Sequence, residues 1–216
     1  MPIALITGTT AGIGAATAQI LAKNGYDLIL NGRRKDRLEE QSEEIKSQYA
    51  IKTKVMHVDV RDHDTVKQYI ERLSSDWKSI DILVNNAGLA AGLNSIESGS
   101  VDHWNRMIDT NIKGLLHVTK YTTPLLKNTN GHIINIGSIA GKEVYLNGNV
   151  YCGTKHMVDA LNKAMRRELA KFGVRVTSIN PGAVETEFSV VRLDGDAEKA
   201  KDVYLGFENL VAQDIA

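Results

Sequence analysis

The stretch Thr7-Gly8-Thr9-Thr10-Ala11-Gly12-Ile13-Gly14 decides the fold. It directly follows the apolar run Ile3–Ile6 and precedes the helical pattern Ala15–Asn24. Glycines are needed where a turn is tight and where the backbone must approach a ligand closely. The N-terminus of a helix presents unbonded N–H groups and the positive end of its dipole to an anion. A strand, a glycine loop and a helix in this order predict a site for the pyrophosphate of a dinucleotide, and a simple turn is the alternative.

Short apolar runs alternate with longer helical patterns along the whole chain. The runs are rich in branched residues, as strands buried on both faces of a sheet usually are. They are Ile3–Ile6, Leu28–Leu30, Val55–Val58, Ile82–Val84, Ile133–Ile136 and Val174–Ile179. The expected helices are Ala15–Asn24, Asp36–Tyr49, Asp64–Trp77, Trp104–Leu126 and Val150–Phe172. The alternation predicts an α/β fold in which residues 1–216 form a single domain, a doubly wound parallel sheet with helices on both faces.

Composition and charge exclude several classes of protein. The 216 residues carry 26 basic and 26 acidic side chains, so nothing indicates the basic face that nucleic-acid binding requires. The chain contains no apolar stretch long enough to span a bilayer, and no charged leader precedes the first apolar run at Ile3. Cys152 is the only cysteine, and the six histidines are scattered, so we expect no disulfide and no metal site. These features favour a cytoplasmic protein without a membrane or nucleic-acid partner.

The end of the second expected strand indicates which dinucleotide binds. Sites of this type read the adenosine ribose there, with an acidic residue for NAD or an arginine for the 2′-phosphate of NADP. The strand ends in Leu30-Asn31-Gly32-Arg33-Arg34, without a carboxylate. The planar guanidinium donates paired hydrogen bonds to phosphate, so Arg33 and Arg34 favour NADP. The alternative is that both arginines only solvate the start of a charged helix.

The glycine spacing, Gly-xxx-Gly-x-Gly, resembles that of the short-chain dehydrogenase/reductase family. Further motifs of that family follow in its own order from residue 7 to residue 186. They are Asn85-Asn86-Ala87-Gly88, Asn111, Ser138, the pair Tyr151 and Lys155, Pro181-Gly182 and Thr186. The resemblance implies a Rossmann fold and an oxidoreductase that transfers a hydride to or from a nicotinamide.

The resemblance also implies a set of cofactor-binding residues. They are Gly8, Thr10, Gly12, Ile13, Gly14, Arg33, Arg34, Asp59, Val60, Asn86, Ala87, Gly88, Tyr151, Lys155, Pro181, Gly182, Val184 and Thr186. Asp59 and Val60 would flank the adenine. A carboxylate that caps the next helix is the alternative for Asp59.

The catalytic group is expected on one helix and the loop before it. Tyr151 and Lys155 are four residues apart, so a helix places both on one face. Tyr151 would be the general acid in ketone reduction and the general base in alcohol oxidation, with its pKa lowered by the Lys155 ammonium. Ser138 would hydrogen-bond the reacting oxygen of the substrate, and Asn111, by resemblance, would support Lys155 through a water. Taken singly, these residues have ordinary alternatives: a surface pair, a loop serine and a buried amide satisfied by backbone.

The substrate is indicated by the stretch Thr186-Glu187-Phe188-Ser189-Val190-Val191-Arg192, followed by Gly195-Asp196. It resembles the NADP-dependent 3-hydroxy acid dehydrogenases of the family, which oxidise serine and allo-threonine. Ser138 and Tyr151 would hold the hydroxyl, and Arg192 is the candidate partner of a carboxylate. An exposed arginine on a mobile lid is the alternative for Arg192. A reductase of another ketone, such as a 3-oxoacyl carrier, and an NADP-binding regulator without turnover are the rival functions.

The last residues depart from the family pattern. Relatives continue with a helix and a final strand at the edge of the sheet, whereas this sequence stops at Ala216, where Asp214 resembles a helix cap. We therefore expect a short C-terminal edge of the sheet. By resemblance, the two long helices expected at Trp104–Leu126 and Val150–Phe172 build a dimer interface, so a homodimer or a homotetramer is expected.

Overall fold

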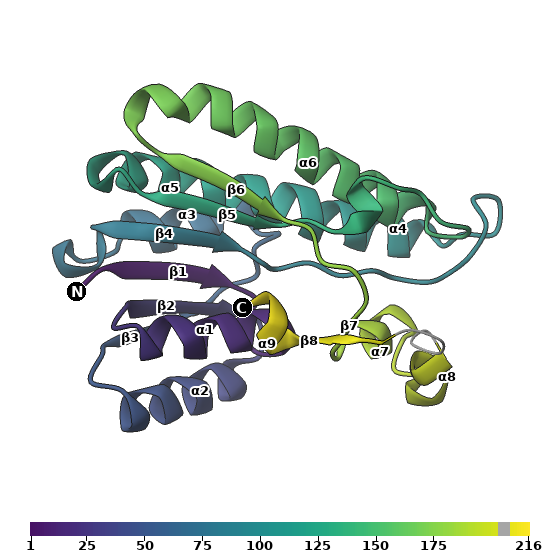
Figure 1. The fold of residues 1–216 in the computed structure, drawn as a ribbon, viewed down its shortest axis with the longest axis horizontal. Helices are drawn as coiled ribbons and strands as arrows, with labels where there is room; N and C mark the ends of the chain where they lie inside the picture. Colours follow the sequence, from purple (N-terminus) through teal and green to yellow (C-terminus); the bar gives the residue numbers. More distant parts are fainter. Residues whose placement is uncertain (203–207) are drawn as a thin grey trace.

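Six strands form one parallel sheet in the computed structural model of the chain, which describes residues 1–202 and 208–216 (Figure 1). The strand order is β3-β2-β1-β4-β5-β6. The strands are β1 Ile3–Thr7, β2 Asp27–Gly32, β3 Thr53–His57, β4 Ile80–Asn85, β5 His132–Ile136 and β6 Arg175–Ile179. Each of the six apolar runs is therefore a strand, and the predicted α/β fold with a parallel sheet is confirmed.

Helices cover both faces of this sheet (Figure 1). They are α1 Gly12–Lys23, α2 Lys35–Gln48, α3 His63–Glu71, α4 Val101–Ile108, α5 Leu115–Thr129 and α6 Asn149–Leu169. Helices α1 and α2 contact β1, β2 and β3, whereas α5 packs on β4, α6 packs on β6, and α3 packs against α5. The prediction of one helix over Asp64–Trp77 was wrong in its extent. Ser74 is extended, so α3 ends at Glu71 and only the 3₁₀ turn Ser75–Trp77 follows.

The core consists of two layers, one on each face of the sheet. In β1 the side chains of Ile3 and Leu5 join the layer that includes α3 and α5, and those of Ala4 and Ile6 join the layer under α1 and α2. Every residue of β1 is consequently buried. Burial on both faces explains why the central strands have continuous apolar runs rather than alternating ones.

The carboxyl ends of the strands all point toward one side of the molecule, where the remaining elements gather (Figure 1). These are the paired strands β7 Val184–Glu185 and β8 Leu210–Val211 and the helices α7 Phe188–Arg192, α8 Ala197–Asp202 and α9 Ala212–Ile215. Asp214 was expected to begin a helix as its cap, but it lies inside α9 and its carboxylate accepts a hydrogen bond from the Val211 N–H at 2.7 Å.

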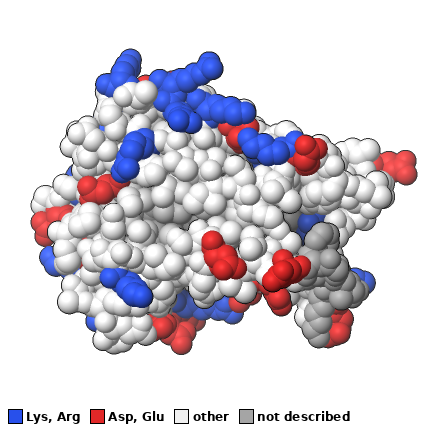
Figure 2. Space-filling view, in the orientation of Figure 1, with Lys and Arg blue, Asp and Glu red and all other residues white. Residues whose placement is uncertain are grey.

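The surface agrees with the balanced charge of the sequence. Figure 2 shows acidic and basic side chains around the rim of the face and few over the middle of the sheet. Ile82 on β4 and Ile134 and Ile136 on β5 are only partly buried. Strand β6 pairs with β5 alone among the described residues, so it is an edge strand. None of the described helices is both long enough and apolar enough to cross a bilayer.

Candidate active site

The glycine loop between β1 and α1 is shaped by close backbone contacts. Gly8 has φ +72° and Gly12 has φ +53°, a region that disfavours residues with a Cβ. A Cβ on Gly14 would lie 2.3 Å from the Gly8 carbonyl oxygen and 2.4 Å from the Asn86 side-chain nitrogen. Only glycine fits at position 14, because the first turn of α1 packs directly onto the loop. The glycine loop therefore leads directly into the N-terminus of α1, whose free N–H groups favour an anion.

The loop after β4 holds the glycine loop in place. The Asn86 side-chain amide donates to the carbonyl oxygens of Thr7 at 2.8 Å and Gly8 at 3.1 Å. In return, the Thr7 hydroxyl accepts from the N–H groups of Asn86 and Ala87, both at 3.0 Å. Sequence reasoning missed Thr7, whose role arises only because β1 and β4 are neighbours in the sheet.

The two arginines after β2 lie beside the glycine loop but differ in their contacts. Arg34 donates to the Thr10 hydroxyl and carbonyl and forms a 2.8 Å ion pair with Glu187, which also pairs with Arg37. The hydrogen bonds from Arg34 and Arg37 lower the pKa of Glu187. Arg33 is exposed, and no ion pair within 4.0 Å joins its guanidinium to a described residue. The alternative that both arginines only solvate the start of a helix does not describe Arg34, because the Arg34 side chain joins the glycine loop to Glu187.

Asp59 does not cap a helix. Its carboxylate accepts hydrogen bonds from Arg61, including one of 2.6 Å from the guanidinium, while Asp62 caps α3 by accepting from the Thr65 N–H. Burial opposes ionisation of Asp59, but these bonds from Arg61 hold its pKa below the ordinary value. The neighbouring Val60 is buried.

Three other predicted cofactor positions, Gly12, Pro181 and Thr186, lie at the glycine loop or just beyond the ends of β6 and β7. A Cβ on Gly12 would lie 3.2 Å from Thr186, so β7 approaches the glycine loop. The Pro181 carbonyl accepts from the Ile139 N–H at 3.0 Å, which joins the ends of β5 and β6. A groove of about 640 Å³ borders the loop, and Thr10, Gly12 and Thr186 are among the residues that line it.

Tyr151 and Lys155 form a buried pair on α6, not a surface pair. They are 9% and 7% exposed. The Lys155 ammonium donates to the Ile136 carbonyl at the end of β5 at 2.8 Å and lies 5.9 Å from the centre of the Tyr151 ring. Ser138 begins the 3₁₀ turn after β5, and its hydroxyl accepts from the Ala140 N–H at 3.1 Å. The structure thus brings Ser138, Tyr151 and Lys155 together at the carboxyl end of β5.

Burial dominates the protonation of this pair. It lowers the pKa of Lys155 to about 8 and raises the pKa of Tyr151 to about 12, although hydrogen bonding with the Ser138 side chain acts in the opposite direction on Tyr151. The expectation that Lys155 lowers the pKa of Tyr151 is not met in the protein alone, because desolvation of the phenol outweighs the nearby charges. At neutral pH the phenol is protonated and can donate a hydrogen bond.

Asn111 lies in a π-helical turn, Asp109–Gly114, between α4 and α5. Its side chain exchanges two 2.8 Å hydrogen bonds with the backbone of Leu89 and donates to the Thr154 hydroxyl at 3.0 Å. Thr154 in turn donates to the Tyr151 carbonyl at 2.7 Å. The contacts of the Asn111 side chain therefore secure the backbone around Tyr151, and none of them is to Lys155.

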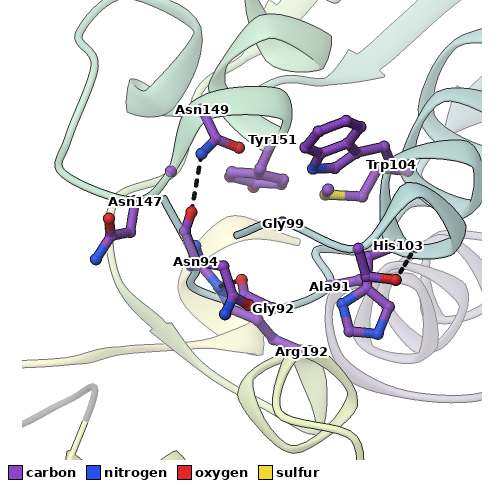
Figure 3. A pocket seen from close by; sticks show the side chains of 13 residues that line it. Ala91, Gly92, Asn94, Gly99, His103, Trp104, Asn147, Asn149, Tyr151 and Arg192 are labelled. Atoms are coloured by element: carbon purple, nitrogen blue, oxygen red, sulfur yellow. Dashed lines mark hydrogen bonds between the residues drawn. The ribbon is translucent and has the colours of Figure 1, made fainter. Parts of the chain in front are cut away.

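The pocket beside Tyr151 is small, and Arg192 reaches it from α7 (Figure 3). Its volume is about 10 Å³, and its lining includes Trp104, Met107, Tyr151 and Arg192. The ring of Phe188 packs edge-on against that of Tyr151, with the ring centres 5.7 Å apart. Arg192 is only 7% exposed, so the alternative of an exposed arginine on a lid is wrong.

Tyr145 is a further residue of this site that sequence reasoning missed. Its hydroxyl accepts a 2.8 Å hydrogen bond from Arg192, and it belongs to the loop before α6. No sequence motif marks this position. Among the described residues there is no cluster of His, Cys, Asp and Glu that could hold a metal ion.

Comparisons with known proteins found related dehydrogenases. A family model described as short chain dehydrogenase matches residues 2–196. The NADP-dependent 3-hydroxy acid dehydrogenase of Schizosaccharomyces pombe is 41% identical over 214 residues, 98% of this chain and 83% of that relative. Serine 3-dehydrogenase of Rhizobium radiobacter is 43% identical over 212 residues, which cover 98% of this chain and 84% of that relative. The solved closed form of serine dehydrogenase complexed with NADP+ has a TM-score of 0.93 at 41% identity, covering 99% of this chain and 85% of that one.

Proposed function

This chain belongs to the short-chain dehydrogenase family, and on that premise we propose that it is an NADP-dependent oxidoreductase acting on small 3-hydroxy acids such as serine or allo-threonine. The observation that carries the proposal is that Tyr151, which neighbours Ser138 and Lys155, lines one pocket together with the buried cation Arg192. A 3-hydroxy acid has both groups that this pocket would bind, a hydroxyl for Tyr151 and a carboxylate for Arg192.

The residues of the glycine loop fit a dinucleotide. The glycine loop and the N-terminus of α1 would hold the pyrophosphate, because glycines at positions 8, 12 and 14 let the backbone of the loop approach a ligand closely. Arg33 and Arg34 would hold the 2′-phosphate beside Thr10. Asp59 and Val60 would flank the adenine. Bound NADP+ would supply the acceptor for the hydride on C3 of the substrate and a positive charge that favours the Tyr151 phenolate.

The remaining steps belong to the side chains of the chain itself. In oxidation, Tyr151 takes the hydroxyl proton of the substrate as general base, and in reduction it returns the proton as general acid. The Ser138 hydroxyl donates to the reacting oxygen and stabilises its developing charge. Lys155 binds the ribose hydroxyls of the cofactor and favours the phenolate, and Asn111 supports it through a water.

Formation of reduced nicotinamide by the purified protein tests the proposal. With NADP and 3-hydroxybutyrate, L-serine or L-allo-threonine, we expect absorbance of the reduced cofactor to rise, and with NAD to rise far more slowly. Tight NADP binding without turnover of any substrate would favour the cofactor-binding regulator. Turnover of 3-oxoacyl carriers as fast as that of the free acids would favour the rival reductase.

Replacing Arg33 with alanine is expected to raise the KM for NADP about tenfold and to leave that for NAD within a factor of two. The reason is that the variant loses a charge-assisted hydrogen bond to the 2′-phosphate, which NAD lacks. Steady-state kinetics with each cofactor measures this. Lys35→Ala removes an exposed charge two positions along the chain and serves as the control. An Arg33→Ala variant with the wild-type KM for NADP would exclude Arg33 as a phosphate ligand.

The assembly and location of the protein belong to the same proposal. We propose a homodimer or homotetramer that uses α5 and α6, which is supported by exposed apolar side chains on these helices, Leu116 and Met157. We propose the cytoplasm as its location and residues 1–216 as one unit that carries both the cofactor site and the catalytic group.

A further inference from the structure

The Arg192 side chain is held from two sides. Its Nε donates to the Gly92 carbonyl at 3.3 Å and its Nη2 to the Tyr145 hydroxyl at 2.8 Å. The Gly92 N–H also donates to the Arg192 carbonyl at 2.8 Å, so backbone and side chain of the arginine are fixed against the same residue. The guanidinium carbon lies 5.3 Å from the centre of the Tyr145 ring and 5.6 Å from that of Tyr151. The charge is thus fixed between two tyrosines.

This buried charge has no anion of its own among the described residues. A guanidinium carries five N–H donors, and described residues accept from two of its nitrogens, Nε and Nη2. No described carboxylate lies within 4.0 Å of Arg192. The nearby Asp194 pairs instead with His103 and Arg106. A buried cation is costly unless it is paired, so the pocket favours an anionic ligand at this point.

The Tyr145 ring is itself held in position. A Cβ on Gly148 would lie 2.4 Å and 2.6 Å from two atoms of that ring, so the ring rests directly on the glycine. The next residue along the loop, Leu146, is 88% exposed. The loop between β5 and α6 therefore directs the Tyr145 hydroxyl onto Arg192, although the residue is 39% exposed, while the side chain of Leu146 lies almost wholly in solvent.

We propose that Tyr145 is a specificity-determining residue, which positions the Arg192 guanidinium for the carboxylate of the substrate. The inference rests on the proposed function, because it assumes a hydroxy acid whose hydroxyl lies at Tyr151. Both rings flank the guanidinium, so a small hydroxy acid with its hydroxyl at Tyr151 would have its carboxylate near Arg192. Tyr145 acts through Arg192, not on the reacting atoms.

Tyr145→Phe removes only the hydroxyl and tests this role. With 3-hydroxybutyrate, we expect kcat/KM to fall roughly tenfold, mainly through a higher KM, because one hydrogen bond to a charged group is lost. With methyl 3-hydroxybutyrate, which has the same hydroxyl but no charge, the fall is expected to be much smaller. The ratio of the two kcat/KM values, acid over ester, therefore drops in the variant. Leu146→Ala is the matched control and keeps the wild-type ratio.

A double-mutant cycle separates positioning from general structural damage. In the background of Arg192→Gln, Tyr145→Phe should have no further effect on the acid, because the group that it positions is gone. Equal losses with acid and ester, or additive losses in the cycle, would overturn the role of Tyr145. A wild-type enzyme that oxidises the ester but not the acid would instead overturn the proposed function, so the two failures are distinguishable.

Discussion

Replacing Tyr151 with phenylalanine is expected to lower kcat for 3-hydroxy acid oxidation about 1000-fold, because the variant loses the group that exchanges the proton of the reacting hydroxyl. The ring stays, so its packing against Phe188 and its burial are retained. Affinity for NADP should change little, because the glycine loop and the arginines are untouched. Steady-state kinetics gives the loss in kcat, and fluorescence titration gives the affinity.

Tyr69→Phe offers a matched control. Tyr69 is also a tyrosine whose pKa burial raises to about 12, and its hydroxyl donates to the Val55 carbonyl at 2.8 Å, away from the pocket. It makes the same chemical change at a site without a proposed role, so kcat should remain at the wild-type value. If the two variants lost the same fraction of kcat, Tyr151 could not be the proton-exchanging group.

Lys155→Met is expected to abolish turnover and yet to stabilise the protein without cofactor at pH 7. Turnover should fall about 1000-fold or more, since the variant loses the ammonium that favours the phenolate and binds the ribose. The free energy of unfolding should rise by about 1–2 kcal/mol, because an apolar side chain of similar size replaces a buried charge. This net gain allows for the loss of the hydrogen bond from Lys155 to the Ile136 carbonyl. Urea unfolding measures the gain.

The pH dependence of this gain follows from the pKa of Lys155, which burial lowers to about 8 in the folded protein from 10.5. Below pH 8 both folded and unfolded chains carry the proton, so the full cost of the buried charge is present. Between pH 8 and 10.5 the unfolded chain binds more protons at Lys155 than the folded chain does. The contribution of Lys155 to the free energy of unfolding of the wild type therefore rises with pH. The advantage of Lys155→Met should therefore shrink between pH 7 and pH 9.5. A gain of equal size at pH 7 and pH 9.5 would show that desolvation of Lys155 is not its cause. Lys113→Met, at an exposed lysine, controls for the loss of a positive charge.

Much of the fold and of the catalytic group could be predicted because it depends on neighbours in sequence. Burial on both faces gives continuous apolar strands, and helical spacing places Tyr151 and Lys155 on one face of α6. The glycines at 8, 12 and 14 are required by a local turn and its contact with the next helix.

The remainder depends on contacts between distant parts of the chain. Tyr145 and Arg192 are 47 positions apart, and Arg34 and Glu187 are 153 apart. Burial of Arg192 follows from the position of α7 over the pocket, which hydrophobic periodicity does not encode. The raised pKa of Tyr151 likewise depends on how deeply the assembled protein buries the phenol.

The order of the strands has a consequence for how the chain reaches its native state. Strand β1 pairs with β2 across a single helix, but it also pairs with β4, where the Thr7 hydroxyl donates to the Val84 carbonyl 77 positions away. Such distant pairing costs loop-closure entropy, so we expect it to form after the pairing of β1 with β2. The glycine loop is held by Asn86 only after that step. A dinucleotide can consequently slow unfolding of the finished protein, but it has no site on a chain whose β4 has not yet docked.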